Sequence, residues 1–309
     1  VPRPRLSAEL VGTLRAMSGW TRRPPAYQGR NAGEPSDLHE IRQGRALSVA
    51  HRPGSDLTLV FIHGTGGNRR QFDPLWTHYA ETGATLLAWD AHGHGASPRF
   101  DPRLPHTLAT DALLDDAETL LNRHATGTTI LIGHSLGARI VLSLLLRLAR
   151  TGRLGQIDAA LLIAPSDLGM ITRAGLFGPF ARLPGPALEW LRPLAGRMFR
   201  DRAWHPDTDP ALIAEQRAQT SGNSLAMITA LLTQATPIDP AALAALTLPI
   251  TILAGQADRL VPRDAAGTIA TALPDTTIEI IPRAGHQIML ERPDACIAAI
   301  ERLRAKVQP

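Results

Sequence analysis

The residues with the clearest chemical potential stand in one short run, Gly133-His134-Ser135-Leu136-Gly137. A serine hydroxyl is a weak nucleophile until a nearby base accepts its proton. Glycines two positions before and after Ser135 carry no Cβ, so they leave room for the sharp turn that would lift its hydroxyl clear of the backbone. The run therefore predicts a serine that attacks an acyl carbon, provided that a base and an orienting acid lie within reach.

His286 and Asp258 are the candidates for that base and that acid. His286 follows an expected strand at 277–281, and Asp258 follows an expected strand at 249–254. Because the carboxyl ends of parallel strands meet at one edge of a sheet, we expect both side chains to face the serine. Asp167, after the preceding strand, is the alternative acid.

Acyl transfer also needs donors for the negative oxygen that forms during attack. The N–H of Leu136 is one candidate, because it lies at the start of an expected helix, where backbone donors are unpaired. The second candidate is the N–H of Thr65, in the loop after an expected strand at 56–62. Gly64 and Gly66 would let that loop pass near a substrate.

The positions of the apolar residues predict alternating strands and helices around these loops. Strands are expected as a pair within 37–50 and at 56–62, 84–89, 128–132, 158–164, 249–254 and 277–281. Helices are expected at 68–81, 107–124, 138–150, 262–273 and 293–305. This alternation predicts a mainly parallel sheet with right-handed crossovers.

The alternation of strands and helices, and its interruption, divide the sequence into four expected segments. Prolines and glycines interrupt it between two late strands, which predicts an inserted helical cap. The expected divisions are an N-terminal arm (1–36), the first part of an α/β core (37–164), the cap (165–235) and the second part of the core (236–309).

Five motifs in this order make the chain resemble the serine α/β-hydrolases, in particular the lid-bearing esterases, lipases and C–C-bond hydrolases. The motifs are His63-Gly64-Thr65-Gly66, Asp90-x-x-Gly93-His94-Gly95-x-Ser97, Gly133-His134-Ser135-Leu136-Gly137, Gly255-x-x-Asp258-x-x-Val261-Pro262 and Gly285-His286. The resemblance spans about residues 37–305 and implies the α/β-hydrolase fold, with Ser135, Asp258 and His286 as a triad. Dehalogenases and epoxide hydrolases of this fold carry aspartate at the place of Ser135, which counts against those activities.

The expected reaction is hydrolysis of small or medium carboxylic esters through an acyl-enzyme, with no metal or organic cofactor. The cap is richer in aromatic residues than the rest of the chain, so Phe177, Phe180 and Trp190 are expected to form an apolar wall for the substrate. Gly64 and His134 are expected to line the same pocket, although His134 could simply pack. The same machinery would also suit a C–C hydrolase, a thioesterase, an acyltransferase or a perhydrolase, and an inactive ligand-binding homologue is a further alternative.

Two other groups of residues have structural interpretations. His92 and His94 form a His-x-His pair, but no third ligand is evident, so we expect a turn there and no zinc site. His63 is expected to orient its own loop through a hydrogen bond. Cys296, the only cysteine, excludes an intrachain disulfide and is expected to be a buried, inert thiol.

Composition limits the partners and the compartment. The 309 residues carry a net charge of +4, almost wholly from scattered arginines, which does not resemble a nucleic-acid site. No apolar run approaches the roughly 20 residues that cross a bilayer, so no integral membrane segment is expected. The single cysteine favours a reducing compartment such as the cytoplasm. We expect a monomer or a homodimer, and because the chain starts at Val1, an earlier leader remains open.

Overall fold

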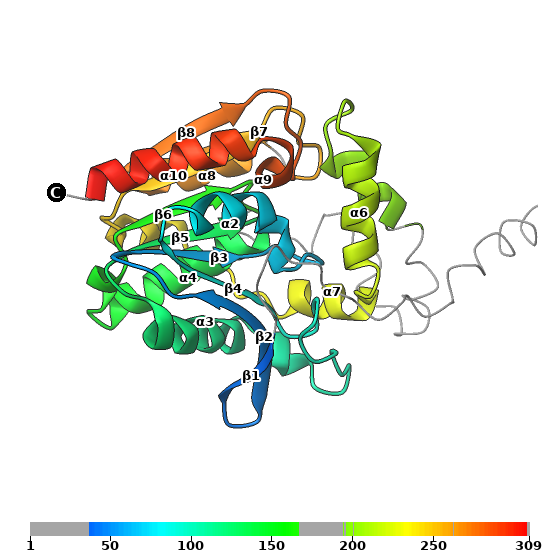
Figure 1. Cartoon of the computed structure of the whole chain (residues 1–309), viewed down its shortest axis with the longest axis horizontal. Coiled ribbons are helices and arrows are strands. Elements are labelled where there is room, and N and C mark those ends of the chain that lie inside the picture. Colours follow the sequence, from blue (N-terminus) through cyan, green and yellow to red (C-terminus); the bar gives the residue numbers. More distant parts are fainter. Residues whose placement is uncertain (1–36, 167–193, 195, 200, 262, 308–309) are drawn as a thin grey trace, which may run out of the picture.

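The computed structural model describes residues 37–166, 194, 196–199, 201–261 and 263–307 of the chain. Its strands are β1 (Asp37–Arg42), β2 (Arg45–Arg52), β3 (Leu57–Ile62), β4 (Thr85–Asp90), β5 (Thr128–His134), β6 (Ala159–Ile163), β7 (Ile250–Gly255) and β8 (Thr276–Ile281). They form one sheet in the order β1-β2-β4-β3-β5-β6-β7-β8 (Figure 1). The pairs from β4 to β8 are parallel, whereas β1 and β2 join as an antiparallel hairpin on one edge.

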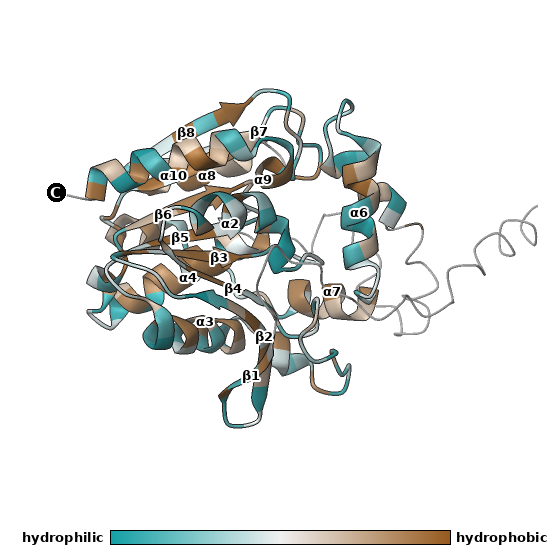
Figure 2. Ribbon diagram, in the orientation of Figure 1, coloured by the Kyte–Doolittle hydropathy of each residue, from teal (hydrophilic) through white to brown (hydrophobic). Residues whose placement is uncertain are grey.

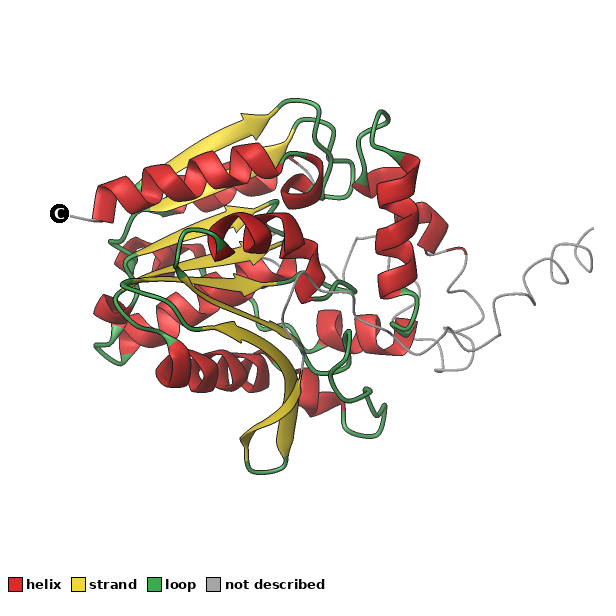
Figure 3. Cartoon of the chain, in the orientation of Figure 1, coloured by secondary structure: helices red, strands yellow, loops and turns green. Residues whose placement is uncertain are grey.

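Helices cover both faces of this sheet (Figure 3). The α-helices are α2 (Asp73–Ala80), α3 (Thr110–His124), α4 (Leu136–Arg150), α6 (Pro210–Thr220), α7 (Leu225–Thr233), α8 (Arg263–Ala272), α9 (Ile288–Glu291) and α10 (Pro293–Val307). Short 3₁₀ turns are η1 (Arg69–Phe72), η2 (Pro105–Leu108), η3 (Leu154–Gln156) and η4 (Pro240–Ala245). The fold is therefore the α/β arrangement that the alternating sequence pattern predicts.

The central strands are buried on both faces, which is why their sequences are continuous apolar runs (Figure 2). Alternate residues of a strand serve opposite faces. On β4, Leu87 and Trp89 pack into the core that includes α3, α4 and α8. Leu86 and Ala88 pack into the core that includes α2 and α10. Cys296 lies in this second core, fully buried as expected, and burial raises the pKa of its thiol.

Two features differ in detail from the sequence expectations. The single helix expected at 68–81 is divided into η1 and α2, and Pro74 stands in the first turn of α2, where its missing N–H costs nothing. The helix after β5 begins at Leu136, directly after the serine, earlier than the expected start at 138.

The chain between β6 and β7 is the long connection of the fold, and α6 and α7 belong to it. Both helices lie beyond the carboxyl ends of the parallel strands (Figure 1). At the far margin of the sheet, Ile278 and Ile280 on β8 are 39% and 52% exposed. Within the described residues, no helix is both long enough and apolar enough to traverse a bilayer.

Candidate active site

Ser135 occupies the turn between β5 and α4 in a strained backbone conformation. Its φ of 53° and ψ of −113° are uncommon for a residue with a side chain. Its N–H donates to the carbonyl oxygen of Ile163 at 2.9 Å, which ties the turn to the neighbouring strand β6. The side chain is half-buried at the carboxyl edge of the sheet. This is the sharp strand-to-helix turn that the sequence run predicts.

The two flanking glycines are required by close packing. A Cβ at Gly133 would lie 2.6 Å from the Cα of Ala138. A Cβ at Gly137 would overlap the carbonyl oxygen of Ile62 on the adjacent strand. The crowding around the turn therefore confirms the steric reason for the Gly-x-Ser-x-Gly spacing.

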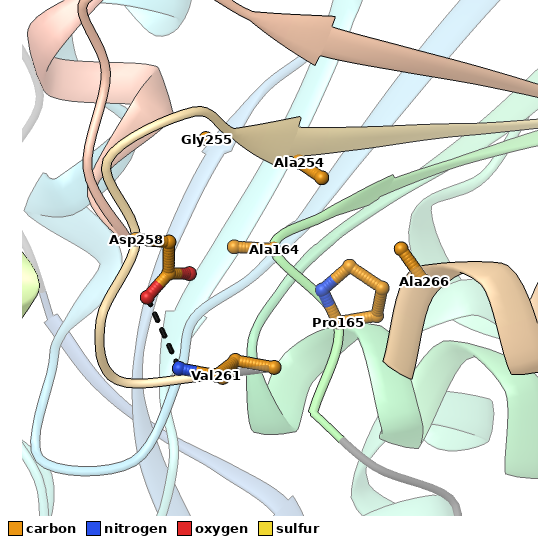
Figure 4. A pocket seen from close by; sticks show the side chains of 7 residues that line it. All are labelled: Ala164, Pro165, Ala254, Gly255, Asp258, Val261 and Ala266. Atoms are coloured by element: carbon orange, nitrogen blue, oxygen red, sulfur yellow. Dashed lines mark hydrogen bonds between the residues drawn. The ribbon is translucent and has the colours of Figure 1, made fainter. Parts of the chain in front are cut away.

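The loops after β7 and β8 bring the expected acid and base together. His286 donates a hydrogen bond from Nδ1 to Oδ2 of Asp258 at 2.8 Å. Their side chains are only 2% and 6% exposed. The other carboxylate oxygen, Oδ1, accepts the N–H groups of Leu260 at 2.8 Å and Val261 at 3.0 Å, the second of which is drawn in Figure 4. This arrangement fixes the tautomer of His286 and leaves its Nε2 as the nitrogen that can exchange a proton.

The charge of Asp258 is held by these contacts. Burial alone would raise the pKa of the carboxyl, but the His286 ring and the two backbone N–H groups outweigh burial, so the pKa lies below its ordinary value. Asp258 is therefore ionised at neutral pH and can stabilise a positively charged His286. The alternative acid, Asp167, and the expected wall residues Phe177, Phe180 and Trp190 lie outside the described residues.

A small pocket borders the acid. It is lined by Ala164, Pro165, Ala254, Gly255, Asp258, Val261 and Ala266 (Figure 4). Apart from Asp258 its lining side chains are apolar, so the pocket adds no further polar partner to the carboxylate. The pairing with His286 is the main side-chain contact that compensates the charge.

The loop after β3, residues 63–67, is held by two buried histidines. His63 donates from Nδ1 to the carbonyl oxygen of Gly64 at 2.8 Å, and its Nε2 accepts the N–H of Ala91 at 2.9 Å. His94 accepts the N–H of Gly66 on its Nε2 at 3.2 Å. The orienting role expected for His63 is thus confirmed, and His94 has the same kind of role.

Both histidines are neutral in the folded chain. Burial lowers the pKa of His94 to about 3, with a further contribution from the neighbouring His63, and burial also lowers the pKa of His63. Because Nε2 of His94 already accepts a backbone N–H, this nitrogen is engaged in the turn. Across the described ranges, no group of three or more His, Cys, Asp or Glu side chains is placed to hold a metal ion.

The same loop passes directly beside the serine. A Cβ on Gly64 would lie 3.0 Å from the Cβ of Ser135, so only glycine allows this approach. The N–H groups of Thr65 and Leu136 have no acceptor among the described residues. Leu136 is the first residue of α4, where the helix dipole favours negative charge. An N–H group without an acceptor is available to a ligand, and the role of these two donors in holding an oxyanion stays a prediction.

Two glutamines that sequence reasoning missed connect this loop to the loop of His286. Gln71 accepts the N–H of Gly64 on its Oε1 at 3.4 Å and donates from Nε2 to Oε1 of Gln287 at 3.2 Å. The amide of Gln71 occupies the space that a side chain at Gly67 would fill. The two glutamines are 216 positions apart, and neither belongs to a motif. No local signal in the sequence could have paired them.

Comparison with known proteins defines the family. The sequence profile of the alpha/beta hydrolase family matches residues 59–299. The chain belongs to this family. The match includes the Ser135 turn and the loops of Asp258 and His286, and the mostly parallel sheet agrees with it.

Several relatives are hydrolases. The chain is 25% identical over 275 residues to a 2-(acetamidomethylene)succinate hydrolase of Mesorhizobium japonicum, which covers 83% of this chain and 91% of the relative. Among solved structures, an esterase from Exiguobacterium antarcticum has a TM-score of 0.74 at 16% identity, covering 87% of this chain and 100% of the other. A thermophilic esterase from Thermogutta terrifontis has a TM-score of 0.71 at 20% identity, covering 85% and 95%. At these identities the structural likeness shows the fold alone.

Proposed function

We propose that the chain is a serine hydrolase that cleaves carboxylic esters through an acyl-enzyme on Ser135. The observation that carries the proposal is the buried hydrogen bond of 2.8 Å between His286 and Asp258, at the sheet edge where the β5–α4 turn presents the serine. An imidazole oriented by a buried carboxylate, at the same sheet edge as a strained serine turn, is the arrangement that activates a hydroxyl.

The proposed reaction has two halves. Ser135 Oγ attacks the ester carbonyl while Nε2 of His286 takes its proton, and Asp258 stabilises the imidazolium. The N–H groups of Thr65 and Leu136 hold the developing oxyanion. His286 then returns the proton to the leaving alcohol, which departs and leaves an acyl group on Ser135. A water molecule, deprotonated by His286, releases the acid in the second half.

An apolar acyl or alkyl group fits the described surroundings of the oxyanion loop. Ile228 on α7 places its Cδ1 3.6 Å from where a Cβ of Gly66 would stand, and Met227 packs against Gly93. Ile228 from the β6–β7 connection therefore adjoins the loop that would hold the oxyanion, and Met227 adjoins the turn after β4. The contribution of Phe177, Phe180 and Trp190 to this wall stays a prediction from the sequence.

A second candidate keeps the acyl-enzyme but changes the leaving group from oxygen to nitrogen. The relative from Mesorhizobium japonicum is named for a compound that contains an acetamido group, and the alignment covers most of both chains. Thioesters, C–C bonds and acyl transfer to alcohol or peroxide would use the same three side chains. A panel of p-nitrophenyl esters, acyl thioesters and N-acyl compounds, with and without competing alcohol or peroxide, would rank these reactions.

The decisive experiment combines a fluorophosphonate probe with a serine variant. We expect the probe to label the folded wild-type chain and not Ser135→Ala, and we expect Ser135→Ala to lose about six orders of magnitude in p-nitrophenyl ester turnover. Ser143→Ala, in helix α4 directly after the Ser135 turn, is the matched control and should retain activity. Absence of labelling in folded wild type would instead favour an inactive ligand-binding homologue.

A further inference from the structure

Glu291, the last residue of α9, connects the loop of His286 to the chain between β6 and β7. Its Oε2 accepts the N–H of Gly285 at 2.9 Å. Its Oε1 accepts the N–H of His205 at 2.7 Å and the hydroxyl of Thr208 at 2.6 Å. One carboxylate thus joins the residue before His286 to a segment about 80 positions earlier.

That earlier segment, residues 201–205, lies against both the base loop and the acid loop. The N–H of His286 donates to the carbonyl oxygen of Ala203 at 2.7 Å. On the acid side, the N–H of Arg259 donates to the carbonyl oxygen of Arg202 at 3.2 Å. The segment therefore contacts the backbone of His286 itself and of the residue that follows Asp258.

Segment 201–205, the His286 loop and the Asp258 loop are closely packed against one another. A Cβ on Gly285 would lie 2.7 Å from the carbonyl oxygen of Ala203. The acid and base loops also bind each other, because the N–H of Ala257 donates to the carbonyl oxygen of Ala284 at 2.8 Å. A small displacement of segment 201–205 would consequently shift the backbone on which the His286 ring is mounted.

Within the described residues, the side-chain carboxylate of Glu291 makes all of its hydrogen bonds at this junction. Backbone N–H groups and one hydroxyl are its donors within the described residues, and no arginine or lysine of that part pairs with it. Hydrogen bonds to an ionised carboxylate are shorter and about twice as strong as those between neutral groups. A carboxylate whose two oxygens accept three hydrogen bonds is therefore suited to fixing the positions of backbone segments rather than to forming a surface ion pair.

We infer that Glu291 is a positioning residue for catalysis, which holds the His286 loop against segment 201–205 and thereby keeps the imidazole aligned with Asp258 and Ser135. The inference rests on the proposed function of Ser135. Glu291 acts through backbone groups and does not contact the reacting atoms. Misplacement of a catalytic group by about 1 Å is enough to cost on the order of a hundredfold in rate.

The test is Glu291→Gln, which keeps the shape but replaces one acceptor oxygen by an NH₂ donor. The new NH₂ group then faces either the N–H of Gly285 or the N–H of His205 and the hydroxyl of Thr208, so at least one hydrogen bond to a backbone N–H is lost. We expect kcat and the rate of fluorophosphonate labelling to fall by about 10- to 100-fold, with KM changed less than about twofold. Glu118→Gln is the matched control, because Glu118 on α3 accepts hydrogen bonds from Arg147 and Arg153 away from the site. Unchanged kcat and labelling in Glu291→Gln would overturn the inference.

A second readout separates this inference from the proposed function. The proton shared by His286 and Asp258 is observable by NMR, and its resonance should shift or broaden in Glu291→Gln but not in Glu118→Gln. Thr208→Val removes one hydrogen bond to Glu291 and leaves the bond to Gly285 intact, so it should lower kcat by about twofold. This milder variant keeps the inference testable if Glu291→Gln fails to fold. If wild type is not labelled, the proposed function fails; if wild type is labelled and Glu291→Gln matches it in rate and resonance, only the positioning role fails.

Discussion

His134 donates a hydrogen bond from its Nε2 to the carbonyl oxygen of His286 at 3.0 Å, across 152 positions of sequence. The two rings lie with their centroids 4.8 Å apart. The residue immediately before the candidate nucleophile therefore holds the backbone of the candidate base. Burial lowers the pKa of His134 well below its ordinary value, so this ring is a neutral donor and not a competing acid.

His134→Phe should lower kcat by about 10- to 100-fold, because it removes the donor and leaves the buried carbonyl oxygen of His286 without a partner. His134→Gln should recover much of the loss, since its side-chain N–H reaches nearly as far as Nε2. Ester turnover of both variants, compared at equal folded concentration, checks this. Equal activity of the Phe and Gln variants would show that the ring only fills space.

Asp258→Asn should reduce kcat by roughly ten-thousandfold, because an amide in place of the carboxylate favours the wrong tautomer of His286. The measurement is kcat for a p-nitrophenyl ester, with circular dichroism to confirm folding. A loss of tenfold or less would transfer the role of the acid to Asp167. The double variant would then be needed to remove the remaining activity.

Gly64→Ala should lower kcat/KM by more than about a hundredfold, because the new methyl group would press on the site from the oxyanion side. It would lie 2.9 Å from Nδ1 of His134 and 3.0 Å from the Cβ of Ser135. Gly155→Ala is the control, since a Cβ there meets nothing within 4 Å. Comparable kinetics for the two variants would contradict the close approach of this loop.

The buried histidines predict a loss of stability on mild acidification. Burial lowers the pKa values of His63, His94 and His134, so below about pH 6.5 these histidines bind protons in the unfolded chain but not in the folded chain. The stabilising contribution of these neutral histidines is therefore fully present above that pH. It should fall by up to about 1.4 kcal/mol per pH unit for each such histidine as pH drops toward its folded pKa.

Urea unfolding between pH 7 and pH 5 measures this slope. His94→Gln, which offers a side-chain oxygen to the N–H of Gly66, should flatten the pH dependence by about one histidine's share. His78→Gln is a control, because His78 lies in the last turn of α2 and is exposed. A pH dependence unchanged by His94→Gln would mean that other groups control acid unfolding.

Much of the fold was predictable because its signals are local. The run 128–132 has no polar alternation, and it is a central strand buried on both faces. The Gly-x-Ser-x-Gly spacing predicts a turn whose steric demands are visible in Gly133 and Gly137. The loops of Asp258 and His286 follow their strands, and the parallel arrangement of those strands is sufficient to bring the two side chains together.

The remainder depends on contacts between distant segments, for which a single sequence carries no signal. Gln71 and Gln287 meet only because η1 and α9 pack side by side. Glu291 reads locally as an ordinary acid near a helix end, and its role emerges only from the position of residues 201–205. The helix expected at 68–81 is divided in the structure, because the sequence pattern does not distinguish the 3₁₀ turn η1 from the first turn of α2.

The position of β8 has a consequence for how the protein loses activity. β8 is the edge strand at one margin of the sheet and leads into the loop of His286, whereas the serine follows the central strand β5. We expect an edge strand with exposed side chains to open locally before the buried central strands do. Detachment of β8 would displace the base while the serine and most helices stayed folded. Ester turnover would then report the integrity of the sheet's margin, and it would decline under denaturant ahead of the helical signal.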